Sequence, residues 1–218
     1  MKKRTPKVLV TGFDPFGGEA VNPSQLIVQA LDGEIVAGHR VAGTILPTQF
    51  GASLPALDKA LARHRPALVL ALGQAGGREG ISLERVAINL IDARILDNAG
   101  AQPVDAPVVE NATNAYFSTL PLKAMLQRLR DEGIPASLSQ TAGTFVCNQV
   151  FFGLMHRLKR RRSVRGGFVH VPYLPEQAAR HAGAPSIPLE KMIVAVRLGL
   201  DVALTTTADA HYAAGSLD

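Results

Sequence analysis

The sequence predicts a single-domain α/β sandwich with a mainly parallel sheet, and three observations support this. Segments of strand character alternate with amphipathic helical segments along the chain. Residues 67–72 and 167–171 are apolar runs of the kind found in strands that are buried on both faces. The length of 218 residues is that of one domain with a single core.

The chain begins with a strand, a loop and a helix. Residues 7–13 are mostly apolar and end before a loop in which Pro15 and paired glycines exclude regular structure. Asn22 and Pro23 are typical of a helix start, and an apolar stripe follows them as far as Leu31.

The remaining elements continue this alternation. Extended segments rich in Val and Ile fill residues 34–48, with a turn expected at Gly38, and residues 53–64 form an amphipathic helix. Residues 96–118 show no clear period and are expected to be irregular, and the chain end from about 210 to 218 is expected to fray. The other predicted elements, in chain order strand, helix, strand, helix, strand and helix, are 67–72, 122–133, 136–139, 148–161, 167–171 and 189–205.

Composition excludes several classes of protein. With 47% apolar and 19% charged residues, the chain has the balance of a folded protein rather than a disordered one. No apolar stretch approaches the roughly 18 residues of a membrane helix, and no hydrophobic signal region follows the basic N-terminus. We therefore expect a cytoplasmic protein that makes no membrane contact.

The net charge of +5 comes from one local run of basic residues. Six basic residues and no acid lie between positions 157 and 165; the rest of the chain has 17 basic and 18 acidic residues. The run follows an apolar stripe of helical spacing, which predicts a solvated helix end. Without zinc-finger spacing or Trp, no nucleic-acid partner is expected, and what the run from Lys159 to Arg162 contacts stays open.

The single cysteine, Cys147, excludes an intramolecular disulfide and a four-thiolate zinc site. It follows a predicted strand and a glycine-containing turn, at the first residues of the next helix. A helix start offers unpaired N–H groups and a positive dipole end, which stabilise a thiolate and an oxyanion. A lone cysteine can also fill a core as a small hydrophobic residue, so position alone leaves both roles open.

His170 lies at the carboxyl end of the predicted strand 167–171, where functional residues of such sheets are found. It is suitably placed to act as a base toward Cys147, which is expected at the end of the neighbouring strand. The alternative is a core histidine whose polar atoms are satisfied by partners. The other histidines fall in predicted surface or terminal segments: His39, His64, His156, His181 and His211.

A third segment, residues 73–89, begins as a Gly-rich loop after a buried strand. A phosphate-binding loop is disfavoured, because the Lys-Ser/Thr ending of a P-loop is absent and the third glycine opens no helix. Glu84 lies in an apolar-rich stretch, where an unpaired carboxylate would be costly. We therefore expect a cationic partner such as His170 or Arg85; the alternative is a surface pair of Glu84 with Arg85.

Taken together, these segments resemble the pyroglutamyl peptidase I (pyrrolidone-carboxylate peptidase) family of cysteine peptidases over nearly the whole chain. Each matching signature is long, and their order and spacing agree. The matches are Thr11-Gly12-Phe13-x-Pro15-Phe16-Gly17-Gly18, Asn22-Pro23-Ser24, Gly73 and Gly76 with Ile81-Ser82-x-Glu84-Arg85-Val86-Ala87-x-Asn89, Ser139-x-Thr141-Ala142-Gly143-x-Phe145-Val146-Cys147-Asn148, and Gly167-Phe168-Val169-His170-Val171-Pro172.

The resemblance implies a three-layer α/β/α sandwich, a triad of Cys147, His170 and Glu84, and removal of an N-terminal pyroglutamyl residue from peptides. The chemistry suits these residue types: the thiolate attacks the carbonyl to give a thioester, the histidine moves protons, and the glutamate orients the imidazolium. The N–H of Cys147 is the expected oxyanion donor, with Arg94 a second by similarity. No metal or other cofactor is required, and the family implies a homo-oligomer, commonly a tetramer.

A pocket for a small, uncharged lactam ring is expected to set specificity. In the family this pocket is aromatic and apolar with amide contacts; aromatic faces suit a flat ring, and Gln74 can pair with a lactam oxygen or N–H. Phe13 and Phe16 could instead be core residues, although a loop flanked by glycines is a poor place for a core. The positions that match the family's pocket are Phe13, Phe16, Gln74, Phe145, Val146, Thr48 and Ile95.

Two other functions remain as alternatives. An enzyme similar to the purine nucleoside phosphorylases would hold phosphate in the glycine loop, so phosphate would stimulate it and alkylation of a structural Cys147 would spare it. A binding module for capped N-termini would show affinity without turnover, and the intact Cys, His and Glu argue against it.

Overall fold

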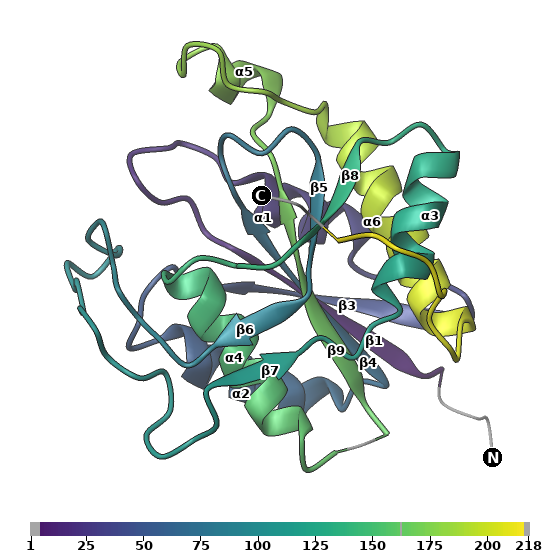
Figure 1. Ribbon diagram of the computed structural model, residues 1–218, viewed down its shortest axis with the longest axis horizontal. Helices are drawn as coiled ribbons and strands as arrows, with labels where there is room; N and C mark the ends of the chain where they lie inside the picture. The colour runs from purple at the N-terminus through teal and green to yellow at the C-terminus, as the bar shows by residue number, and fades with distance from the viewer. Residues whose placement is uncertain (1–4, 162, 216–218) are drawn as a thin grey trace.

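The computed structural model describes residues 5–161 and 163–215, in which a seven-stranded sheet lies between two layers of helices (Figure 1). The predicted α/β/α sandwich with a mainly parallel sheet is confirmed. The strands, in spatial order, are β2 (Ile35–Val36), β3 (His39–Leu46), β1 (Lys7–Phe13), β4 (Leu68–Gln74), β9 (Arg165–Val171), β5 (Ile81–Glu84) and β8 (Ala136–Ser139).

Two reversals of direction interrupt this sheet. Strands β3, β1, β4 and β9 run parallel to one another, and β2 is antiparallel to β3. Strand β5 is antiparallel to β9, and β8 is parallel to β5. The last two strands therefore run opposite to the central four, and this arrangement determines how the candidate site is assembled.

The helices divide between the two faces of the sheet (Figure 1). One face carries α1 (Pro23–Leu31), α3 (Leu122–Asp131) and α6 (Leu189–Thr205), whose apolar residues form one core cluster with the sheet. The other face carries α2 (Ser53–His64) and α4 (Val146–Leu158), which build the second cluster. A four-residue helix, α5 (Pro175–Ala178), follows β9.

The first helix starts where the sequence predicts it. Asn22 adopts an extended conformation, and its side-chain oxygen accepts a hydrogen bond from the Ser24 N–H at 3.0 Å, as an N-cap does. The Ser24 hydroxyl accepts from the Phe13 N–H at 3.0 Å and so ties the helix start to the end of β1. Gly12 is needed for this approach, because a Cβ there would lie 2.5 Å from the Ser24 carbonyl oxygen.

The prediction of irregular structure for residues 96–118 is wrong at its end. Strand β7 (Ala115–Phe117) pairs antiparallel with β6 (Val86–Ile88), and this small ribbon contacts α4. The helix α4 also ends at Leu158 rather than at the predicted residue 161. A three-residue strand is too short to show a period, so its partner and the helix beneath it determine its conformation.

The end of the chain contacts α3 through Asp209 and Tyr212. The Asp209 carboxylate accepts from the Ala124 N–H at 2.9 Å, in the first turn of α3. The Tyr212 hydroxyl donates to the Lys123 carbonyl at 2.8 Å, and fraying of residues from about 210 to 218 stays a prediction. Residues 216–218 lie outside the described part of the chain.

Several members of the basic run take part in the fold. Arg157 forms an ion pair with Asp58 on α2, and the Lys159 ammonium donates to the Tyr116 hydroxyl at 3.2 Å. Arg165 donates to the carbonyl of Thr206 at 2.7 Å; Arg162 lies outside the described residues. In the part of the chain that the structure describes, no helix is long and apolar enough to cross a membrane.

Candidate active site

A cavity of about 420 Å³ brings together side chains from five separate segments of the sequence. It opens beside the ends of β4 and β9 and the start of α4, and its wall includes charged, aromatic and amide groups. Predicted site residues at this wall are Phe16, Gln74, Arg94, Ile95, Phe145, Cys147 and His170.

A buried histidine–carboxylate pair lies at one side of this cavity. The antiparallel register of β5 and β9 places Ser82 opposite His170, so Glu84, two residues further on, projects from the same face. His170 Nδ1 lies 2.7 Å from Glu84 Oε1, and Glu84 is fully buried. An ionised carboxylate only accepts hydrogen bonds, so Nδ1 carries the proton and Nε2 is left for the cavity.

Cys147 reaches the cavity by a different route from the one predicted. Strand β5 separates β8 from β9, so the expectation that Cys147 follows the strand next to His170 is wrong. The chain crosses from β8 through a loop, and Cys147 lies in the first turn of α4. Gly73 pairs with His170 in the sheet, and a Cβ on Gly73 would be 2.8 Å from Cys147 Sγ. The thiol therefore lies directly over the strand that neighbours His170.

The surroundings of the thiol disfavour a resting thiolate. Burial, and after it the charge of Glu84, raises the pKa of Cys147 to about 12. The residue as a whole is only half-buried, and no side chain among the described residues caps the start of α4. The helix start still offers N–H groups to an anion, but proton removal from Cys147 requires a base within the cavity.

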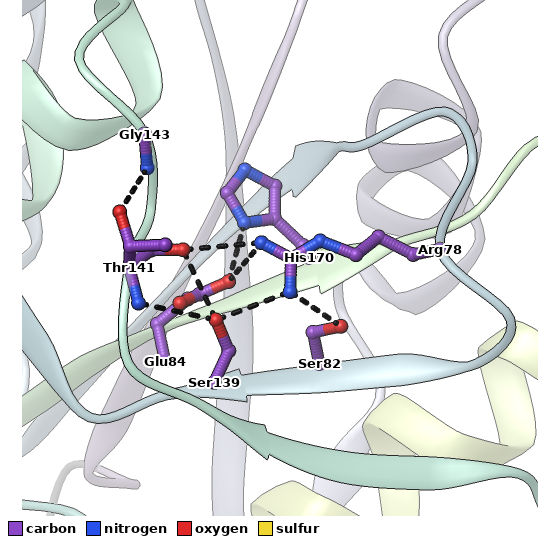
Figure 2. Close-up of polar contacts among 7 residues, drawn as sticks. All are labelled: Arg78, Ser82, Glu84, Ser139, Thr141, Gly143 and His170. Atoms are coloured by element: carbon purple, nitrogen blue, oxygen red, sulfur yellow. Dashed lines mark hydrogen bonds and ion pairs between the residues drawn. The ribbon is translucent and has the colours of Figure 1, made fainter. Parts of the chain in front are cut away.

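Arg78 is the second partner of Glu84 Oε1, as Figure 2 shows, whereas Glu84 Oε2 is buried without a hydrogen-bond partner among the described residues. One guanidinium nitrogen lies 3.6 Å from Glu84 Oε1, and the same nitrogen donates to the Thr141 carbonyl at 3.1 Å. The other terminal nitrogen donates to the Ser139 hydroxyl at 3.1 Å. Arg78 thus connects the buried carboxylate to the loop that leads to Cys147. The partners of Glu84 are the His170 imidazole and the Arg78 guanidinium, and the alternative of a surface pair with Arg85 is wrong.

Sequence reasoning missed two buried amides next to the cysteine. Asn148 donates to the carbonyls of Ile88 and Leu90, each at 2.9 Å, and accepts from the Ile88 N–H at 3.0 Å. Gln149 donates to the Phe50 carbonyl at 3.0 Å. Both side chains fix the loops around the start of α4. The sequence did contain a signal for them: two amide side chains lie within an otherwise apolar part of the helix. Buried polar groups require partners, so amides in such a stretch indicate contacts with neighbouring loops.

Three predicted pocket residues do not line the cavity. Phe13 is 1% exposed and packs against Phe168 with ring centroids 6.5 Å apart, so the alternative of a core residue holds for it. Val146 is fully buried in the core beneath α4. The Thr48 hydroxyl donates to the Asp14 carbonyl at 3.1 Å, which holds the loop after β1. By contrast, the rings of Phe16 and Phe145 lie 6.1 Å apart at the cavity wall.

Comparison with known proteins agrees with this arrangement. A family model described as pyroglutamyl peptidase matches residues 6–206. A pyrrolidone-carboxylate peptidase of Cupriavidus taiwanensis is 56% identical over 214 residues, which cover 97% of this chain and 99% of that protein. A pyrrolidone-carboxylate peptidase of Yersinia pestis is 51% identical over 212 residues, with 97% and 99% covered.

Solved structures show the same likeness. The crystal structure of the pyroglutamyl peptidase I from Bacillus amyloliquefaciens has a TM-score of 0.93 and 44% identity, covering 95% of this chain and 99% of that one. The pyrrolidone carboxyl peptidase from Thermococcus litoralis has a TM-score of 0.91 and 38% identity, covering 95% and 99%. The chain therefore belongs to the pyroglutamyl peptidase family of cysteine peptidases.

Proposed function

We propose that this enzyme removes N-terminal pyroglutamyl residues from peptides through a triad of Cys147, His170 and Glu84 and a thioester intermediate. The observation that carries the proposal is the 2.7 Å contact of His170 Nδ1 with the buried Glu84, beside a cavity lined by Cys147. This arrangement supplies a nucleophile, a base and a group that orients the base, which are the parts required for acyl transfer.

The first half of the reaction forms the acyl-enzyme. His170 Nε2 takes the proton of the Cys147 thiol as sulfur attacks the pyroglutamyl carbonyl carbon. The tetrahedral oxyanion accepts from the N–H of Cys147 at the start of α4 and from the Arg94 guanidinium at the cavity wall. When the C–N bond breaks, His170 returns its proton to the leaving amine, and a thioester remains on Cys147.

The second half releases free pyroglutamate. His170 takes a proton from water, the hydroxide attacks the thioester carbonyl, and the C–S bond breaks with return of the proton to sulfur. Glu84 stays ionised and stabilises the imidazolium that forms in both halves. The raised pKa of the Cys147 thiol favours transfer of its proton to His170 as the sulfur attacks, rather than a thiolate formed beforehand.

The lactam ring is proposed to bind among Phe16, Phe145, Ile95 and Gln74, which line the cavity that Cys147 faces. Two aromatic faces and an aliphatic side chain suit a flat, uncharged ring, and the amide supplies polar recognition. Phe13, Val146 and Thr48 would support this wall from behind. The expected tetramer, the cytoplasmic location and the absence of a nucleic-acid partner stay predictions.

Replacing Glu84 with Gln is expected to lower turnover. It should also lower the pKa of the Cys147 thiol, although a lower thiol pKa alone would favour reaction. An amide keeps an acceptor oxygen for His170 Nδ1–H but removes the negative charge, so we expect a roughly 10- to 1,000-fold loss of kcat. The thiol pKa falls because Glu84 is one of the two causes that raise it. Thiolate absorbance as a function of pH measures the pKa, and a thiol pKa unchanged in the variant would contradict this account.

The function is tested by release of a fluorogenic amine from a pyroglutamyl amide, with the prolyl amide as control. We expect turnover of the pyroglutamyl compound only, abolished by one equivalent of iodoacetamide and unaffected by EDTA or phosphate. No turnover by folded, reduced protein would refute the peptidase proposal. Activity that survives alkylation and rises with phosphate would favour the phosphorylase-like alternative.

A further inference from the structure

Gln177 is a buried amide that the proposed reaction does not use. It lies in α5, has no exposed surface, and contacts the loop before α1 as well as the end of β4. Its Oε1 accepts from the Leu174 N–H at 3.1 Å. Its Nε2 lies within hydrogen-bond distance of three oxygens: Val21 O at 3.2 Å, Glu19 Oε2 at 3.1 Å and Gln74 Oε1 at 3.1 Å.

These neighbours permit only one orientation of the Gln177 amide. The backbone N–H of Leu174 can only donate, and the backbone carbonyl of Val21 can only accept. Glu19 is also an acceptor, because hydrogen bonds from His181, Gln177 and Arg180 outweigh burial and lower the pKa of its carboxyl. The oxygen of Gln177 must therefore face Leu174, and its N–H groups must face the other three atoms.

The orientation of Gln177 in turn fixes the orientation of Gln74. A donor faces the end of the Gln74 side chain, so the Gln74 atom at that contact must be the oxygen. The amide nitrogen of Gln74 then points the other way. Gln74 lines the cavity with Cys147 and also an adjoining cavity that shares Phe16, Arg94 and Ile95 with it, and its nitrogen has no hydrogen-bond partner among the described residues. Gln74 can therefore donate a hydrogen bond to a bound molecule through its amide nitrogen, whereas its oxygen is already used by Gln177.

We propose that Gln177 is a positioning residue that holds the Gln74 N–H groups toward the cavity, so that the site recognises the carbonyl oxygen of the substrate ring. The proposal rests on the proposed function for the identity of that ring, a pyroglutamyl lactam. A lactam carbonyl accepts from the amide N–H of Gln74. A prolyl ring has no such oxygen and carries a cationic nitrogen, which the donor repels.

The test compares Gln177→Met, which has similar length but no donor, with wild type. Once the Gln74 amide is free to turn, we expect kcat/KM for the pyroglutamyl amide to fall about tenfold, mainly through KM, which is the scale of one hydrogen bond. Gln74→Met should show a similar loss. Adding Gln177→Met to Gln74→Met should then change little, because both act on one contact.

Ring probes show which atom is recognised. We expect Gln177→Met to raise the inhibition constants of 2-pyrrolidone and of cyclopentanone by the same factor, because both rings carry the carbonyl and only the first carries an N–H. A loss confined to 2-pyrrolidone would overturn the proposal, because the site would then read the ring N–H. Fully additive losses in the double variant would overturn it too, because Gln177 would then act independently of Gln74.

Two further variants separate positioning from general damage to the fold. Gln177→Leu is also apolar and lacks the donor, so it should reproduce the loss even if Gln177→Met proves unstable. Arg180→Met removes an exposed contact of Glu19 while His181 still binds that carboxylate at 2.8 Å, so it should leave KM unchanged. Failure of wild type to cleave the pyroglutamyl amide would count against the proposed function. The role of Gln177 would still be tested by measuring, through the shift in Tm, how tightly wild type and Gln177→Met bind 2-pyrrolidone and cyclopentanone.

Discussion

Cys147→Ser is expected to lose at least roughly 10³-fold in kcat/KM on a pyroglutamyl amide while the protein stays folded. A serine hydroxyl is less acidic and less nucleophilic than a thiol, so attack on the carbonyl with the same base is much slower in a site arranged around sulfur. Oxygen in place of sulfur is a small change at a half-buried position, and Tm should shift by only a few degrees. Steady-state kinetics and thermal unfolding measure the two quantities.

This variant must also keep its ring pocket. Because Gln74, Phe16 and Phe145 are untouched, 2-pyrrolidone should stabilise Cys147→Ser against heat as much as it stabilises wild type. A variant that retains more than about a tenth of wild-type turnover would show that Cys147 is not the nucleophile. Equal loss of turnover and of 2-pyrrolidone binding would point to a damaged pocket.

His170→Ala is expected to lower kcat by roughly 10²- to 10⁴-fold, the range of a positioned acid–base group. Without the imidazole, no histidine lines the cavity beside the thiol and Glu84 loses its closest hydrogen-bond partner, so alkylation of Cys147 by iodoacetamide should slow as well. Removing one partner of a buried pair also costs stability, about 3 kcal/mol, with Arg78 still beside the carboxylate. Kinetics should therefore be measured well below the lowered Tm.

The matched control is His156→Ala. His156 lies on α4, where its ring contacts the Tyr116 hydroxyl at 3.0 Å, and it does not line the cavity. It should keep the wild-type rate and the wild-type alkylation of Cys147. Added imidazole should restore part of the turnover of His170→Ala only. If the two histidine variants lost activity equally, the assignment of His170 as the base would be contradicted.

Elements of the fold were predicted correctly where a local sequence pattern, such as a helix-capping residue or an apolar run, agreed with how deeply the element is buried. Asn22 and Pro23 begin α1 as predicted, and the apolar run that became β4 is buried along its whole length. The direction of β5 did not follow, because an antiparallel strand within a parallel sheet depends on pairing with β9 rather than on its own residues. Because β5 lies between β8 and β9, Cys147 does not follow the strand next to β9; it lines the cavity with His170 from the start of α4.

The sequence predicted the residues of the candidate triad, but it did not predict the side chains that hold site residues in place. Glu84 stood out as a carboxylate in an apolar stretch, and the sequence indicated His170 among its possible partners. Arg78 and Gln177 could not be found in this way, since each acts through a long side chain that reaches a segment distant in sequence. Phe13 packs in the core on the same face of the sheet and does not line the cavity, because the boundary between cavity wall and core depends on packing, which sequence does not show.

The most direct test of the proposed mechanism is to trap the acyl-enzyme. Wild-type enzyme mixed with excess pyroglutamyl amide and quenched in acid within milliseconds should carry one pyroglutamyl group on the peptide that contains Cys147, detected by mass spectrometry. Hydroxylamine should release it, as expected for a thioester. A labelled Cys147 peptide would establish covalent catalysis at this residue. Rapid turnover with no adduct at any quench time, or an adduct on another residue, would contradict the account.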